Sequence, residues 1–313
     1  MNARRTISIP QDLLPADGRF GSGPSRIRSE FVDDLAGTAT TYLGTSHRQP
    51  GVRSVVGSIR DGLTALYDLS TDYEVVLGLG GATAFWDAAA FSLVGNRSSH
   101  FVCGEFSEKF AAVVSDAPHL DTPVVVAAEY GSAPDPEEVV GVDTAAYIHN
   151  ETSTGVVASF DRFEDELVLV DGTSAAGVIP IDTSLVDVYY FSPQKALGSE
   201  GGLWIALMSP LAIARIAEIA ASKRWIPPFL SLETALGNSR KNQTYNTPAL
   251  TTLYLLDRQI SLLMSSGGLE AAHATSATSS RYLYEWATGS TFASPFVTEQ
   301  RFRSPTVVTI DID

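Results

Sequence analysis

The chain has 313 residues, of which 44% are hydrophobic and 18% are charged. This composition excludes a disordered protein, and the length predicts one large domain with a smaller one. The net charge of -15 argues against general binding to nucleic acid or to an anionic membrane, because both reward clustered cations. A single cysteine, Cys103, excludes an intrachain disulfide and, with no signal peptide or membrane span visible, predicts a soluble cytoplasmic protein.

Apolar residues at helical spacing predict a first long helix over about 52–66. A strand at 73–77 and a helix at 84–91 follow. Further apolar runs predict strands at 100–103, 123–127, 144–148, 167–171, 186–191 and 203–208. Strands that are apolar on both faces, with helices between them, indicate a mainly parallel sheet covered on both sides. Ligands of such sheets bind beyond the carboxyl ends of the strands.

The pattern changes after about residue 249. Two helices are expected, one over 250–264 and one over 270–286, and a strand is expected at 306–310. One lone strand would leave an open edge, so we expect the small domain to be incomplete in this chain. The predicted division is an N-terminal segment at 1–21 that joins the small domain, a large domain at 22–257 and a small C-terminal domain at 258–313.

Lys195 carries the strongest chemical signal in the sequence. It follows the apolar strand at 186–191 and precedes a glycine-rich stretch, while Asp171 ends the strand at 167–171. A buried amine and a buried carboxylate at strand ends are what a pyridoxal phosphate enzyme uses, for the Schiff base and for the pyridinium nitrogen. Burial would also lower the pKa of the lysine and favour its nucleophilic neutral form. The alternatives are a solvated lysine and a helix N-cap at Asp171.

Three polar turns could complete such a site. The glycine-rich turn at 78–83 joins a strand to a helix, where free amides and the helix dipole favour a phosphate, although many such turns are only tight connections. His47 and Arg48 precede the first long helix and either bind an anionic group or stand on the surface without such a role. The turn at 149–155 offers hydroxyls and an amide, but alone it reads as a turn.

Taken in order, short strings of the sequence resemble the phosphoserine aminotransferase family, a fold-type I family of the class V aminotransferases. The strings lie at 19–25, 44–48, 80–86, 104–107, 149–155, 192–195 and 242–248. They span nearly the whole chain, and their joint order is far more specific than any one string. The resemblance implies an α/β fold with a mainly parallel seven-stranded sheet in the large domain and a small α/β domain at the C-terminus.

The resemblance also implies roles around the cofactor ring. Lys195 would hold pyridoxal 5'-phosphate as an aldimine and move the proton between the substrate and cofactor carbons. Asp171 would pair with the pyridinium nitrogen, Thr152 would contact the phenolic oxygen, and Phe106 would stack on the ring where many relatives have a tryptophan.

The implied reaction transfers an amino group from glutamate to 3-phosphohydroxypyruvate in L-serine biosynthesis, and some family members also act in pyridoxine biosynthesis. His47 and Arg48 would bind the phosphate of the substrate. The phosphate of the cofactor would be held by Gly81, Ala82, Thr83, Gln194 and, from the partner subunit of a homodimer, Asn246 and Thr247.

Two departures from the family pattern matter for the substrate. Some relatives carry an arginine where this chain has Ala82, and the family continues beyond Asp313 with a histidine–arginine pair and the arginine for the substrate α-carboxylate. Two alternatives therefore stay open. The chain could be another class V aminotransferase of the alanine- or serine-glyoxylate type, or a cofactor-binding form that does not catalyse. A cysteine desulfurase is disfavoured, because Cys103 lies in a predicted strand rather than in a mobile loop.

Overall fold

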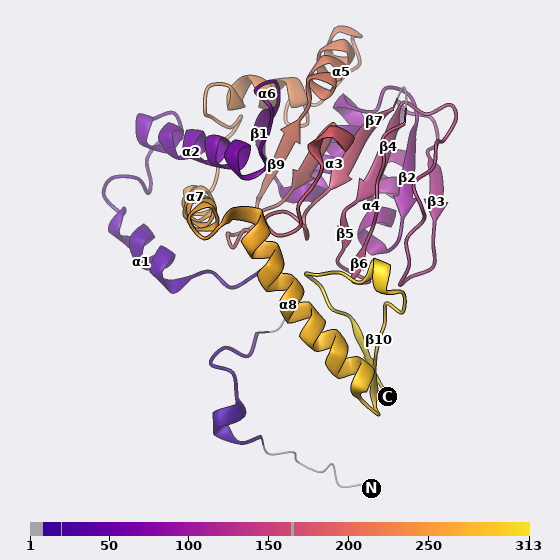
Figure 1. Cartoon of the computed structure of the whole chain (residues 1–313). Helices are drawn as coiled ribbons and strands as arrows, with labels where there is room; N and C mark the ends of the chain where they lie inside the picture. The colour runs from indigo at the N-terminus through magenta and orange to yellow at the C-terminus, as the bar shows by residue number, and fades with distance from the viewer. Residues whose placement is uncertain (1–8, 20, 164–165) are drawn as a thin grey trace, which may run out of the picture.

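The computed structural model describes residues 9–19, 21–163 and 166–313. Residues 1–8 of the segment predicted at 1–21, and Phe20, which belongs to one of the matched strings, therefore lie outside the description. The centre of the structure is a seven-stranded sheet in the order β1-β9-β8-β7-β4-β2-β3 (Figure 1). The strands are β1 (Glu74–Leu79), β2 (Ser98–Val102), β3 (Val124–Ala127), β4 (Thr144–Ile148), β7 (Leu167–Asp171), β8 (Val188–Phe191) and β9 (Leu203–Met208). Only β9 is antiparallel to its neighbours in this sheet, which confirms the predicted mainly parallel α/β sheet.

Helices cover both faces of the sheet and bury two apolar layers. Side chains of β8 alternate, so that Tyr189 and Phe191 enter one layer while Val188 and Tyr190 enter the other. The first layer is closed by α2 (Pro50–Leu66) and α7 (Leu250–Ser265), and α1 (Ser29–Gly37) packs on α7. The second layer is closed by α3 (Gly81–Ser92), α4 (Glu105–Ser115), α5 (Pro210–Ala221) and α6 (Leu232–Ser239).

Helix α2 shows why the sequence forms these layers. Pro50 occupies its first turn, where a missing N–H is no loss. Val52, Val56, Ile59 and Leu63 recur along one face and are all fully or almost fully buried. Each such side chain contributes about 1.5–3 kcal/mol by leaving water, so the stripe fixes the helix on the sheet.

The C-terminal part begins with α8 (Gly268–Gly289), which runs from α7 toward the hairpin of β10 (Ala293–Pro295) and β11 (Ile310–Ile312) (Figure 1). The strand predicted at 306–310 is wrong in extent, because only Ile310 belongs to β11. The residues before it are held by side chains instead: Thr306 donates its hydroxyl to the Ser174 carbonyl, and Thr309 donates to the Thr154 carbonyl. The boundary expected at 257/258 falls inside α7, and the division into domains stays a prediction.

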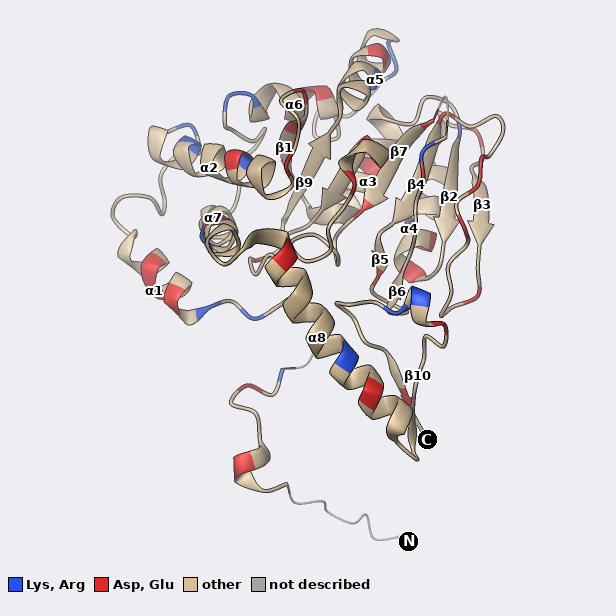
Figure 2. Cartoon of the chain, viewed as in Figure 1, with Lys and Arg blue, Asp and Glu red and all other residues tan. Residues whose placement is uncertain are grey.

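The remaining elements are short. They are the hairpin β5 (Asn150–Glu151) with β6 (Val156–Val157) and the 3-10 turns η1 (Gln11–Leu13), η2 (Thr183–Leu185) and η3 (Gln300–Phe302). Charged residues lie mainly on the outer helices and loops, and α8 carries few of them (Figure 2). In the part of the chain that the structure describes, no helix combines the length and apolar character needed to cross a membrane.

Candidate active site

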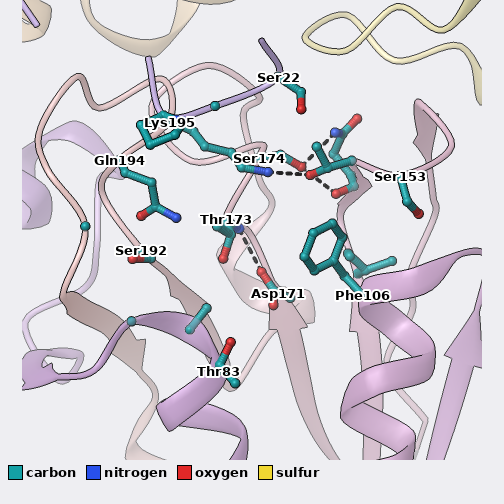
Figure 3. Close-up of a pocket in the computed structure, with 18 of the residues that line it drawn as sticks. Ser22, Thr83, Phe106, Ser153, Asp171, Thr173, Ser174, Ser192, Gln194 and Lys195 are labelled. Atoms are coloured by element: carbon teal, nitrogen blue, oxygen red, sulfur yellow. Dashed lines mark hydrogen bonds between the residues drawn. The ribbon is translucent and has the colours of Figure 1, made fainter. Parts of the chain in front are cut away.

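A cavity of about 620 Å³, here called the Lys195 cavity, opens at the carboxyl ends of the sheet strands (Figure 3). Asp171 ends β7, Lys195 follows β8, and Gly81 begins α3 directly after β1. These ends meet at one edge because the strands run parallel, which is the usual ligand position of such sheets. Eight of the sequence-predicted site residues line the cavity: Gly81, Ala82, Thr83, Phe106, Thr152, Asp171, Gln194 and Lys195.

The side chain of Lys195 points across the cavity toward the turn after β5, which contains Thr152 (Figure 3). Its Nζ donates a hydrogen bond to Thr152 Oγ1 and lies 5.5 Å from the centre of the Phe106 ring. Burial lowers the pKa of Lys195, and the negative charges of Asp171 and Glu151 oppose that shift. The amine therefore sits where its neutral, nucleophilic form is favoured relative to a solvated lysine.

The N-terminal segment fixes the backbone of Lys195 from the other side. Ser25 donates its N–H to the Gln194 carbonyl at 2.7 Å and its hydroxyl to the Lys195 carbonyl. Gly23 has φ +140°, and a Cβ added there would lie 3.1 Å from Lys195 Cγ. A glycine is required at this position, because a side chain would be strained and would press on the lysine.

Asp171 is buried, with 5% of its surface exposed, and two donors hold its carboxylate. The N–H of Thr173 binds Oδ1 at 2.8 Å, and the indole Nε1 of Trp86 binds Oδ2 at 3.2 Å. Burial raises the pKa of Asp171, while these hydrogen bonds and the charge of Lys195 act in the opposite direction. The carboxylate thus combines a fixed orientation with a strong preference for a cationic or proton-donating partner.

The first turn of α3 forms the floor of the cavity. Gly80 and Gly81 have φ of +104° and +74°, a left-handed conformation that turns the chain from β1 directly into the helix. The first amides of a helix have no partner within it, and the helix dipole adds a partial positive charge. Together with the hydroxyl of Thr83, they make this turn a suitable phosphate site.

Three buried polar atoms on residues that line the cavity have no hydrogen-bond partner within the described ranges: Asn150 Oδ1, Thr173 Oγ1 and Gln194 Oε1. An unpaired buried polar atom costs about 1–3 kcal/mol, so these atoms indicate a polar ligand. An amine, a carboxylate, the face of Phe106 and a helix N-terminus complete the set. The residues present fit pyridoxal phosphate, which has an aldehyde, a ring nitrogen, an aromatic ring and a phosphate.

Four predicted site residues do not line this cavity: His47, Arg48, Asn246 and Thr247. The structure brings two of them together elsewhere, since Thr247 Oγ1 lies 3.1 Å from Nδ1 of the buried His47. Asn246, Thr247 and Arg48 are exposed beside it. The roles given to these residues, like those of the residues in the cavity, remain predictions.

Sequence reasoning missed two residues of this site. Trp86 lies three residues after Thr83, so one helical turn brings its indole under the end of β7, and this spacing was a usable signal. Glu151 lies in the polar turn at 149–155, but its burial and its contacts with α4 depend on the packing of distant segments. No local pattern reports such a contact.

Comparison with known proteins agrees with this geometry. Residues 139–313 match the family model described as aminotransferase class-V. The chain is 53% identical over 311 residues to a protein of Rhodococcus jostii named phosphoserine aminotransferase, covering 98% of this chain and 83% of that one. A protein of Nocardioides sp. with the same name is 53% identical over 312 residues, with the same coverage.

Solved structures show the same fold at low sequence identity. A phosphoserine aminotransferase of Cytophaga hutchinsonii superposes with a TM-score of 0.83 at 23% identity, covering 91% of this chain and 81% of that one. The enzyme of Bacillus circulans subsp. alkalophilus gives a TM-score of 0.82 at 20% identity, covering 94% and 82%. These matches confirm the expected pyridoxal phosphate fold type I. By its sequence relatives and its fold, the chain belongs to the phosphoserine aminotransferase family of class V aminotransferases.

Proposed function

We propose that the protein transfers an amino group from glutamate to 3-phosphohydroxypyruvate, with pyridoxal phosphate bound in the Lys195 cavity. The observation that carries the proposal is that Lys195, Asp171 and the first turn of α3 line one cavity of about 620 Å³. Family membership supports the same reaction, and the chain spans 83% of the length of the relatives it matches.

The chemistry divides between the cofactor and the chain. When bound, pyridoxal phosphate supplies an aldehyde that condenses with amines and a ring that stabilises negative charge on the neighbouring carbon. Lys195 Nζ, whose pKa is lowered by burial, is the amine that would carry the cofactor and the base that would move the proton at the substrate α-carbon. The hydroxyl of Thr152, bonded to Nζ, would orient the amine for both tasks.

Three further groups would bind and orient. Asp171 would hold a proton on the ring nitrogen, because a buried carboxylate is stabilised by a cationic partner and two hydrogen-bond donors already orient it. Phe106 would cover one face of the ring and exclude water from it. The amides at the start of α3, with Ala82, Thr83 and Gln194, would hold the phosphate.

An absorbance spectrum recorded before and after addition of glutamate tests the proposal. We expect a visible or near-ultraviolet band from the bound cofactor that glutamate shifts, and no such band after Lys195→Ala. Addition of 3-phosphohydroxypyruvate should then restore the first spectrum, faster than glyoxylate does. Faster recovery with glyoxylate would favour an alanine- or serine-glyoxylate aminotransferase, and a spectrum that glutamate leaves unchanged would favour a cofactor-binding form that does not catalyse. A protein that takes up no pyridoxal phosphate would refute the proposal.

The assembly is part of the same proposal. Asn246 and Thr247 are exposed and lie outside the lining of the cavity in their own chain, which supports their contribution to the site of a partner subunit in a homodimer. Because Thr247 contacts His47, His47 and Arg48 would accompany them and meet the phosphate of the substrate there. A second role in pyridoxine biosynthesis would use the same site, with a phosphorylated precursor of hydroxythreonine type as the substrate.

Mixed dimers test this sharing of residues. Lys195→Ala and Thr247→Ala chains are expected to be weakly active alone. After unfolding and refolding together they should regain up to about a quarter of the wild-type activity, because half of the dimers are mixed and each mixed dimer holds one intact site. A Lys195→Ala/Thr247→Ala double variant mixed with Lys195→Ala is the control. No gain on mixing the single variants would contradict the shared site.

A further inference from the structure

Glu151 is a buried carboxylate to which neither the sequence nor the relatives give a role. It lies in β5 directly before Thr152 and has no exposed surface. Within the described residues it forms no salt bridge, and hydrogen bonds hold its two oxygens, while its charge acts at longer range on Lys195. Burying a charged carboxylate costs free energy unless hydrogen-bond donors surround it. The donors around Glu151 therefore show which segments it joins.

Five donors from two segments surround this carboxylate. From the start of α4, Ser107 donates its N–H to Oε2 at 3.0 Å, and Phe106 donates its N–H to Oε1 at 3.4 Å. The hydroxyl of Ser107 also lies 3.0 Å from Oε2 and shares its one proton between Oε2 and the Gly104 carbonyl. From the turn after β5, Ser153 donates its N–H at 3.1 Å and its hydroxyl at 2.7 Å to Oε1. The carboxylate therefore caps the N-terminus of α4 with both oxygens and, through Oε1, also holds the turn that contains Thr152.

The backbone leaves room for this arrangement at Gly104, just before α4. A Cβ added to Gly104 would lie 2.5 Å from Glu151 Cγ and 2.5 Å from Ser153 Oγ. A glycine here therefore lets the two segments approach as closely as the shared carboxylate requires. The other carboxylates of the first turn of α4, on Glu105 and Glu108, are exposed and take no part.

The two segments that Glu151 joins carry two groups that contact or face Lys195. The ring of Phe106 lies 5.5 Å from Lys195 Nζ, and Thr152 Oγ1 accepts a hydrogen bond from the same atom. We propose that Glu151 is a positioning residue for amino transfer, because it clamps the start of α4 to the turn after β5 and so sets Phe106 and Thr152 relative to Lys195. The inference rests on the proposed function for its consequence in catalysis, but the clamp itself can be measured without a cofactor.

The variant Glu151→Gln keeps the shape of the side chain but replaces one acceptor oxygen by an amide NH2 group. This group can only donate, and it would face the N–H and O–H donors that now bind the carboxylate. Glu108→Gln removes a carboxylate from the same helix turn and serves as the matched control. In the protein without cofactor, we expect faster hydrogen exchange in peptides covering 104–108 and 150–154 together in Glu151→Gln, and wild-type exchange in the control. Acceleration of only one of the two segments would overturn the clamp.

The bound cofactor provides a second readout, which a remote structural role would not move. In Glu151→Gln we expect the circular dichroism of the bound cofactor to weaken and its dissociation constant to rise by about tenfold. In Glu108→Gln both should stay within about twofold of wild type. Unchanged dichroism and affinity in Glu151→Gln would overturn the positioning role.

Milder variants keep the inference testable where Glu151→Gln does not fold. Ser107→Ala removes one donor on the α4 side, and Ser153→Ala removes one on the side of the turn. Each should accelerate exchange in both segments, and an effect confined to the segment carrying the substitution would overturn the proposal. Wild-type protein that binds no cofactor would end the proposed function alone, because the exchange experiment would still decide whether the clamp exists.

Discussion

Replacing Trp86 by phenylalanine tests how the buried carboxylate of Asp171 is kept in its charged form. The indole Nε1 donates to Asp171 Oδ2 at 3.2 Å, and the indole ring stacks on Phe110 with 6.0 Å between ring centres. Phenylalanine keeps most of the stacking surface but has no donor. The substitution therefore removes one hydrogen bond from the carboxylate while largely preserving the apolar packing.

The size of the effect follows from the charge. A hydrogen bond to a charged group contributes about 1.5–3 kcal/mol, and its loss would raise the pKa of Asp171 further. Burial already raises this pKa, so the folded protein binds the Asp171 proton more tightly than the unfolded chain does. The stability that this group contributes is present below its unfolded pKa and is lost as the pH rises through its folded pKa. The cost of Trp86→Phe should therefore be full where Asp171 is ionised and should shrink as the pH falls and Asp171 becomes protonated.

Urea unfolding of the cofactor-free protein over a pH series that runs upward from acid pH measures this dependence. Trp204→Phe is the matched control, because Trp204 is equally buried, at 4% exposed, and packs edge-on against Phe85. We expect Trp86→Phe to lose more stability at the higher end of the series than at the acid end, by up to about 1.5–3 kcal/mol, and Trp204→Phe to lose the same amount throughout. Equal pH dependence in the two variants would refute the reasoning.

Three other outcomes follow from the same contacts. Gly172→Ala should lower the free energy of unfolding by about 1–3 kcal/mol in urea, because its Cβ would lie 2.2 Å from Cζ of the buried Tyr189. Asp187→Ala should cost about 1–3 kcal/mol in the same assay, because it leaves the buried N–H of Val168, now bonded at 2.9 Å, without an acceptor. In the cofactor-free protein, labelling of Lys195 by an amine reagent should reach half its maximal rate at a lower pH than a solvated lysine peptide, because burial lowers its pKa. A midpoint equal to that of the peptide would contradict this last expectation.

The sheet could be predicted from the sequence because its strands are apolar on both faces. A continuously apolar run such as that of β9 (Leu203–Met208) must be buried on both faces. The number of such runs and their order along the chain predict an α/β fold. Helix α4 was not predicted, because most of its apolar residues are consecutive, at 110–114, and its first turn carries exposed charge. The strand expected at 306–310 was misplaced because Thr306 and Thr309 bind the carbonyls of Ser174 and Thr154, and such contacts leave no periodic signal.

The candidate site also contains residues that the sequence could predict and residues that it could not. Lys195 and Asp171 follow apolar strands, so the parallel sheet alone brings them to one edge, and the sequence could predict their proximity. The hydrogen bonds of Trp86 and Glu151 join segments that are far apart along the chain. Their geometry depends on how α3 and α4 pack on the sheet, which propensity and spacing do not determine.

Electrostatics connects the cavity with the residues that do not line it. Among the described residues that line the Lys195 cavity, Lys195 is the only cation, while Asp171 and Glu105 are acidic and Glu151 lies close behind. The proposed substrate carries a phosphate and a carboxylate, and anions of this kind are usually bound by arginine or by several fixed donors. The amides of α3 would already be engaged by the cofactor phosphate. The cations for the substrate must then come from outside this lining, and the exposed Arg48 beside the His47–Thr247 contact is one group that a second subunit could bring to it.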